Sequence, residues 1–199
     1  MNGKIVSVKR GIIIFTGVKA WIFIYSICMV LTVRCAAQAI APEAVRVQAA
    51  YEVYRKQPNA SANHLAYIAA FPATKEAFMD VFNDPAFDEL YRESPAYVDL
   101  YVQLSRNYPT QALPKAVAIG KRLVYSDWQA AGMQQALMYL AAHHTDSFAM
   151  HVKRLPKKER PCVARFLADR DVPPVEYDML VGNLQKIGEA RLAAIFIQA

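Results

Sequence analysis

Apolar side chains recur along most of the chain at intervals of three and four residues, the spacing that lines one face of an α-helix. Shorter stripes run through segments 47–54, 78–82, 97–104, 113–124, 148–155, 163–167, 177–184 and 192–196. The longest stripe contains Met133, Ala136, Leu137, Leu140 and Ala141. No segment combines sustained alternation with an enrichment in β-branched residues, which would indicate a strand. The pattern therefore predicts an all-α protein.

Prolines divide these stripes into short helices, because a proline inside a helix loses a hydrogen bond and clashes with the preceding turn. We expect breaks at Pro72, Pro109, Pro156 and the pair Pro173–Pro174. Helix starts are expected where a capping side chain precedes a proline or an apolar stripe, namely at Asp84–Pro85, Ser94–Pro95, Ser126–Asp127 and Thr145 or Asp146. The segments between breaks have ordinary helix lengths of roughly 9 to 17 residues.

About ten short helices joined by tight turns can bury their apolar stripes only against one another. Residues 40–199 are therefore predicted to form one domain, a single compact array. It is either an irregular bundle or a short stack of helical pairs of the HEAT or TPR kind, although no repeat period aligns the residues. The segment 169–174 is the best candidate for a sub-boundary, but the helices after it are too apolar to stand alone.

The first 39 residues have the three-part plan of a secretory signal peptide. They contain five basic residues and no acidic one, and a 13-residue apolar run extends from Trp21 to Val33. Small residues then surround Gln38 in the sequence Ala37-Gln38-Ala39, where a signal peptidase requires them. We predict cleavage after Ala39, so that residues 1–39 are a signal peptide and residues 40–199 are exported.

Two alternatives for this segment remain open. Residues 11–33 are long enough to form an uncleaved membrane anchor, although Lys19 is costly within a span. A lipoprotein with Cys35 as the lipidated residue is a poorer match, because Arg34 occupies a position that normally requires a small residue. A cleaved signal is favoured over both.

The basic character of the chain belongs to this leader. The whole sequence has 23 Lys and Arg against 17 Asp and Glu, a net charge of +6. Subtracting the five basic residues of the leader leaves 18 against 17 in residues 40–199, a net charge of +1. Nothing in this balance indicates a nucleic-acid partner, whose binding depends on neutralising many phosphates.

One group of residues has the types that bind a metal, and it consists of His143, His144, Asp146 and His151. Imidazole and carboxylate are zinc ligands, and a catalytic zinc needs three of them with an open position. The spacing matches no zinc motif, and there is no H-E-x-x-H. A metal-dependent hydrolase that uses these residues is therefore the alternative function, while helical packing and capping are the favoured roles.

A basic corner surrounds Pro156 and comprises Lys153, Arg154, Lys157, Lys158 and Arg160. It could attract an anionic partner, but a solvated corner is the favoured interpretation.

Cys162 is the only cysteine after the leader, so the domain has no internal disulfide. No local base is present to activate its thiol, and we expect a small buried apolar side chain there.

Tyrosines give the best candidate interface. Ten of the 11 tyrosines lie after the leader, and four of them fall within 18 residues: Tyr91, Tyr97, Tyr101 and Tyr108. Tyrosine combines a large apolar area with a polar tip and is enriched at protein interfaces. The other interpretation is that Tyr97 and Tyr101 line the edge of the core with their hydroxyls at the surface.

Familiar catalytic motifs are missing from the sequence. It has no phosphate-binding glycine loop, no G-x-S-x-G, no S-x-x-K and no Cys-x-x-Cys. We therefore expect no cofactor and no enzymatic activity. The predicted function is a protein- or peptide-interaction module of the bacterial cell envelope, periplasmic or secreted.

Overall fold

The computed structural model describes residues 42–82, 88–123, 128–169 and 175–199. These residues form ten α-helices and no strand, which confirms the all-α prediction for this part of the chain. The helices are α2 (Pro42–Lys56), α3 (Ser61–Ala70), α4 (Lys75–Phe82), α5 (Asp88–Asn107), α6 (Pro109–Gly120), α7 (Trp128–His143), α8 (Thr145–Arg154), α9 (Arg160–Ala168), α10 (Val175–Lys186) and α11 (Ala190–Ile197). The predicted signal peptide lies outside the described residues.

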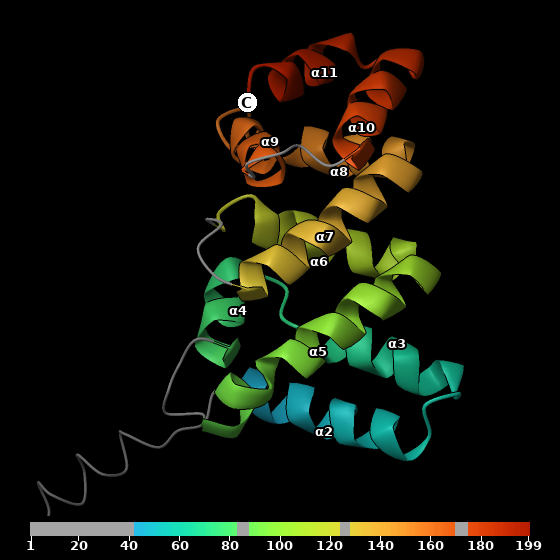
Figure 1. The fold of residues 1–199 in the computed structure, drawn as a ribbon, viewed down its shortest axis with the longest axis vertical. Coiled ribbons are helices and arrows are strands. Elements are labelled where there is room, and N and C mark those ends of the chain that lie inside the picture. Colours follow the sequence, from blue (N-terminus) through green and yellow to red (C-terminus); the bar gives the residue numbers. More distant parts are fainter. Residues whose placement is uncertain (1–41, 83–87, 124–127, 170–174) are drawn as a thin grey trace, which may run out of the picture. The chain divides into compact units, whose positions relative to one another are not determined.

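Successive helices pair as hairpins, and the hairpins stack in two layers (Figure 1). The pairs are α2 with α3, α5 with α6, α7 with α8, and α10 with α11. Helices α5, α7 and α10 pack side by side in one layer, and α3, α6 and α8 do so in the other. Residues 41–199 form one compact unit. No described helix is both long and apolar enough to cross a bilayer.

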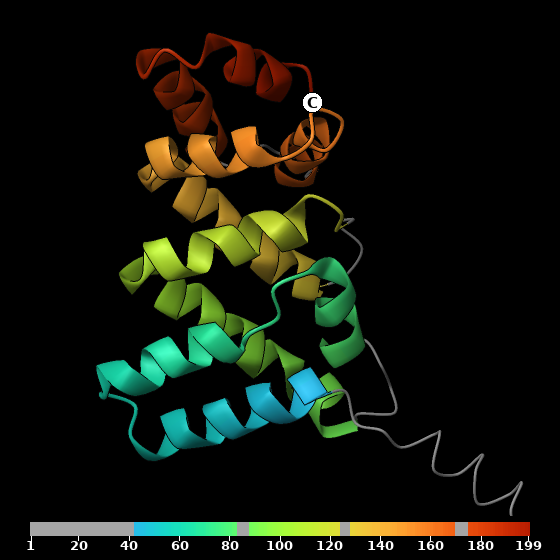
Figure 2. The ribbon, with the colours of Figure 1, turned by 180° about the vertical axis from the view of Figure 1, so that it is seen from behind.

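The two sides of this stack differ. The turns of the α2–α3, α5–α6 and α7–α8 hairpins share one edge, on the right of Figure 1 and the left of Figure 2. The short helices α4 and α9 lie at the opposite edge (Figure 2). Pro109 is the first residue of α6, and the breaks expected at Pro72 and Pro156 fall just after α3 and α8.

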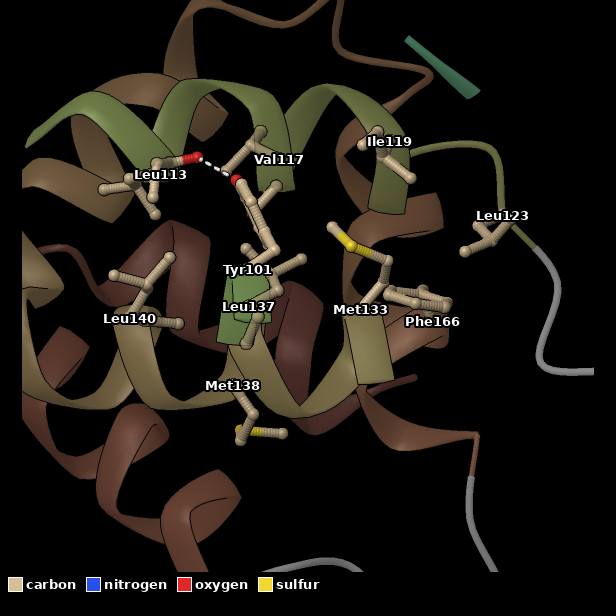
Figure 3. Close-up of a cluster of buried hydrophobic side chains, with 14 of the residues drawn as sticks. Tyr101, Leu113, Val117, Ile119, Leu123, Met133, Leu137, Met138, Leu140 and Phe166 are labelled. Carbon is tan, nitrogen blue, oxygen red and sulfur yellow. Dashed lines mark hydrogen bonds between the residues drawn. The ribbon is translucent and has the colours of Figure 1, made fainter. Parts of the chain in front are cut away.

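One continuous core fills the space between the layers. Figure 3 shows its centre, where Tyr101 of α5 lies between Leu113 and Val117 of α6 and Leu137 of α7. The predicted stripe of α7 is buried throughout: Met133, Ala136, Leu137, Leu140 and Ala141. Burial of the Met133, Leu137 and Leu140 side chains contributes about 1.5–3 kcal/mol each, which makes this stripe a principal source of stability.

Three buried tyrosine hydroxyls connect neighbouring helices through backbone carbonyls. Tyr67 of α3 donates to the carbonyl of Tyr97 in α5 at 2.7 Å. Tyr101 of α5 donates to the carbonyl of Ala112 in α6 at 2.8 Å, as drawn in Figure 3. Tyr177 of α10 donates to the carbonyl of Phe196 in α11 at 2.6 Å. Each bond satisfies a hydroxyl that would otherwise be buried without a partner.

One predicted helix start and one predicted helix cap need correction. Ser94–Pro95 does not begin a helix, because α5 runs from Asp88 through Pro95 to Asn107. Packing of its apolar stripe against α7 and α3 outweighs the hydrogen bond that the proline removes. Thr145 does not cap α8 from outside, since it is the first residue of that helix and its hydroxyl donates to the Ala141 carbonyl at 2.9 Å. Asp84–Pro85 and Ser126–Asp127 lie outside the described residues.

Candidate functional site

The structure separates the three predicted interface tyrosines whose side chains it describes. Tyr97 and Tyr101 are only 1% and 0% exposed, so their rings pack inside the stack instead of meeting a partner. This corrects both interpretations of these two residues, because neither hydroxyl reaches the surface from such a depth. The side chain of Tyr91 lies outside the described residues. Tyr108, which precedes α6, is half-buried and remains a surface candidate.

Tyr108 belongs to a small aromatic cluster that unites three helices. Its hydroxyl lies 3.1 Å from Nδ1 of His64 in α3, and the other ring nitrogen of His64 lies 2.6 Å from the Pro58 carbonyl. Since a carbonyl can only accept, Nε2 carries a proton, and in the neutral imidazole Nδ1 then accepts from the tyrosine hydroxyl. The ring of Tyr54 in α2 lies 5.7 Å from the His64 ring. The cluster therefore ties the α2–α3 turn to the start of α6.

A second cluster connects the ends of α5 and α7. The guanidinium carbon of Arg106 lies over the Tyr139 ring, 5.0 Å from its centre. The His143 ring is 4.3 Å from that of Tyr139, tilted by 35°. Arg106 and His143 are exposed and Tyr139 is half-buried. A cation, an aromatic ring and an imidazole thus form one surface group.

The residues of both clusters lie near the helix ends at the α2–α3, α5–α6 and α7–α8 turns, and these turns share one edge (Figure 1). Arg106 and Tyr108 are two residues apart across the α5–α6 turn and carry one cluster each. We call the six side chains of the two clusters the aromatic edge: Tyr54, His64, Arg106, Tyr108, Tyr139 and His143. Such a surface offers aromatic faces, hydroxyl groups and a positive charge to a ligand, which suits binding.

The proposed metal ligands are not gathered into a site. No three His, Cys, Asp or Glu side chains within the described ranges, which include all four candidates, are placed to hold a metal ion. His143 lies against Tyr139, and His144 is the residue that precedes α8. His151 is half-buried, and burial together with the charge of Arg154 lowers its pKa. The four side chains therefore do not converge, and the hypothesis of a metal site there is corrected.

Some residues of the basic corner make hydrogen bonds or ion pairs within the fold. The Arg160 guanidinium donates to the carbonyls of Lys153 and Leu155, at 2.7 and 3.2 Å, and so satisfies the end of α8. Lys153 pairs with Glu189 at 2.5 Å. Arg154, Lys157 and Lys158 remain exposed. The residues of the corner therefore divide between structural contacts and a solvated group of three.

Cys162 is half-exposed in the first turn of α9, so the prediction of a buried thiol is corrected. It lies four residues before Phe166 and so borders the buried stripe of Val163, Phe166 and Leu167 without being fully covered. The sulfur lies 3.4 Å from a guanidinium nitrogen of Arg165. Within the described ranges, no side chain that could act as a general base contacts the sulfur.

An ion-pair network joins the helices at the opposite edge. Glu159, just before α9, lies 3.0 Å from Lys121 and 3.4 Å from Arg122, both of which follow α6. Arg122 also reaches Glu76 of α4 at 3.1 Å. The hydrogen bond from Lys121 is the main cause that lowers the pKa of Glu159. This network is a structural connection between α4, α6 and α9.

Most of the aromatic edge escaped sequence analysis. Only Tyr108 and His143 were singled out, and His143 was assigned to another group. The contact between His64 and Tyr108 spans 44 residues, so no local spacing indicates it. One feature of the sequence could have indicated Tyr54 and Tyr139 as surface candidates: both are tyrosines close to predicted helix ends.

Comparison with known proteins finds no matching family model, no similar curated protein and no significantly matching solved structure.

Proposed function

We propose that this protein is an exported, non-enzymatic interaction module of the bacterial cell envelope that binds a protein or peptide segment along the aromatic edge. The observation that carries the proposal is the surface group of Arg106, Tyr139 and His143, next to the cluster around Tyr108. Export rests on the sequence of residues 1–39.

The composition of the edge supports binding. Tyrosine and arginine are the residue types that contribute most to interface energies, because they bury a large area at a small cost in side-chain entropy. The rings of Tyr54, Tyr108 and Tyr139 are already held against neighbours, so little freedom remains to be lost when a ligand binds.

The architecture gives the proposal a rationale. We interpret the paired helices as a short stack of the HEAT or TPR kind, in which successive hairpins present a continuous surface to a ligand. The edge takes its residues from three successive hairpins, so a partner that lies along it touches all three. This interpretation concerns helix packing and carries no function by itself.

Site-specific photo-crosslinking tests the proposal in cells that make the full chain. Gln135 is exposed and lies one helical turn before Tyr139, whereas Lys157 is exposed on the basic corner. With a photoreactive amino acid at position 135 we expect a defined crosslinked partner, and with the same group at position 157 we expect none. The crosslink should disappear when Arg106 and Tyr139 are both replaced by alanine. Equal crosslinking from both positions, or none from 135, would contradict the proposal.

A further inference from the structure

We infer that the partner segment is acidic, and that one of its carboxylates binds Arg106 while a neighbouring apolar or aromatic side chain packs on Tyr139 and Tyr108. This inference rests on the proposed function and specifies the chemistry of its ligand. It depends on the charges and contacts of the edge and not on any motif in the sequence.

Arg106 is a cation that the fold leaves without an anion. Arg46, Arg55 and Arg122 all pair with glutamates. Arg106 makes no ion pair and no hydrogen bond with an oxygen among the described residues, and its one recorded contact is the Tyr139 ring. A guanidinium has five N–H donors whose arrangement matches a carboxylate. Those donors have no oxygen acceptor within the described part of the fold.

The contact with Tyr139 distinguishes Arg106 from other exposed cations. A long flexible side chain loses conformational entropy when it grips a ligand, and that loss weakens most surface ion pairs. Because Arg106 already rests over an aromatic ring, part of its freedom is lost before any ligand arrives. Arg154 is also exposed, but no aromatic ring among the described residues holds it. Arg106 is therefore the better prepared of the two to bind a carboxylate.

The helix dipoles make the binding of a carboxylate depend more strongly on Arg106. Arg106 lies in the last turn of α5 and His143 ends α7, where the negative ends of the helix dipoles favour cations. The same negative ends disfavour an incoming carboxylate unless a positive charge stands between them. Binding of an acidic segment should then depend steeply on Arg106, more than on a cation in a neutral environment.

The other residues of the aromatic edge favour a peptide over a free anion as the ligand. Tyr108 is two residues from Arg106, which places their Cα atoms within about 7 Å of each other. A short extended peptide can therefore contact Arg106 with one side chain and the Tyr108 and Tyr54 rings with another. Asp146, in the first turn of α8, is the nearest acidic residue in the sequence to His143 and forms no ion pair with it. No described carboxylate already occupies the position of the ligand on Arg106.

A random dodecapeptide library displayed on phage, selected against the purified protein made from the full chain, tests this inference. We expect the selected peptides to be enriched in Asp and Glu. A selected peptide should bind about tenfold more weakly to the Arg106→Ala variant, which corresponds to the loss of one charge-assisted contact. Replacing its acidic residues by Asn and Gln should have the same effect. The matched control replaces Arg154, Lys157 and Lys158 by alanine, removes three exposed charges and should leave binding unchanged.

Every other outcome contradicts the inference, and the outcomes can be distinguished from one another. Acidic peptides that bind Arg106→Ala normally show that Arg106 is not the anion site, and their loss with the triple variant places that site at the basic corner. Selected peptides without acidic enrichment that are lost on Tyr139→Ala contradict the acidic ligand and leave the proposed function standing. Absence of any selected peptide contradicts both. Flotation with phosphatidylglycerol vesicles, if it alone responds to Arg106→Ala, would show a lipid surface as the ligand instead.

Discussion

At the scale of single residues, the tyrosines divide into two kinds with different physical roles. Tyr67, Tyr101 and Tyr177 are buried and donate their hydroxyls to carbonyls of neighbouring helices. Tyr54 and Tyr108 lie half-buried on the aromatic edge. The first kind stabilises the stack, and the second is available to a ligand.

Tyr101→Phe isolates the contribution of one buried hydroxyl. The change removes the 2.8 Å bond to the Ala112 carbonyl and leaves the ring in place. We expect the free energy of unfolding to fall by about 1 kcal/mol, the usual net value of such a bond. Urea unfolding followed by circular dichroism measures it. Tyr54→Phe is the control and should change stability little, because no hydrogen bond of the Tyr54 hydroxyl is recorded within the described part. Equal losses in both variants would show that the hydroxyl bond contributes nothing specific.

The buried tyrosines also predict a dependence of stability on pH. Burial raises the pKa of Tyr177 to about 12, and it raises those of Tyr67 and Tyr101 as well. A raised pKa means that the folded state holds its proton more tightly than the unfolded state, whose tyrosines titrate near pH 10. The stabilisation is therefore complete below about pH 10 and declines as the pH rises toward 12. Unfolding curves between pH 8 and 11.5 should show this decline, and it should be shallower in Tyr177→Phe. A pH-independent stability across that range would refute the expectation.

At the scale of helices, one glycine determines how closely α5 and α7 approach. A Cβ atom at Gly132 of α7 would lie 2.5 Å from Cγ1 of Val98 in α5. That distance is far shorter than a normal carbon–carbon contact, so a larger residue must push the two helices apart. Val98 is fully buried and can move little. This small residue permits the packing that brings Arg106 over Tyr139 at the ends of the same two helices.

Gly132→Ala should therefore destabilise the protein by about 1–3 kcal/mol, the usual cost of overpacking. Gly182 in α10 is a matched control, since nothing lies within 4 Å of the Cβ that alanine would add there. Gly182→Ala should increase stability by about 0.5–1 kcal/mol through the higher helix propensity of alanine. Thermal or urea unfolding distinguishes the two. If both substitutions had the same sign, the close approach of α5 and α7 would not limit stability.

At the scale of the whole molecule, the proposal of export concerns both the N-terminal segment and the helical unit. Residues 1–39 carry the signal pattern, and residues 41–199 form a compact unit with its own core. Stability of that unit does not depend on a disulfide, because Cys162 is the only cysteine in it. A cleaved leader would therefore leave an intact folded domain.

Fusion of residues 1–45 to alkaline phosphatase tests this proposal, since the enzyme is active only after export. We expect phosphatase activity in cells, and mass spectrometry of the native chain should find a new N-terminus at Ile40. Replacing Ile24 and Val30 by aspartate interrupts the apolar run and should abolish export. An intact chain in the membrane fraction would support the anchor formed by residues 11–33. Loss of membrane attachment in Cys35→Ser would support the lipoprotein.

The sequence by itself determined the class of fold and most of the divisions between helices. Helical spacing and proline geometry act over a few residues, so the stripe from Met133 to Ala141 and the breaks at Pro72, Pro109 and Pro156 could be predicted correctly. The same local rules placed a helix start at Pro95, which was wrong because packing against α7 and α3 keeps α5 continuous there.

Only the tertiary structure decided which tyrosines are buried and which are surface groups. Periodicity indicates that Tyr97 and Tyr101 share a face of α5, but it does not show that α3, α6 and α7 cover that face completely. The aromatic edge likewise takes its members from helices distant in sequence, such as His64 and Tyr108 or Arg106 and Tyr139. Such contacts arise from the way whole hairpins stack, and no interaction between residues close in sequence encodes them.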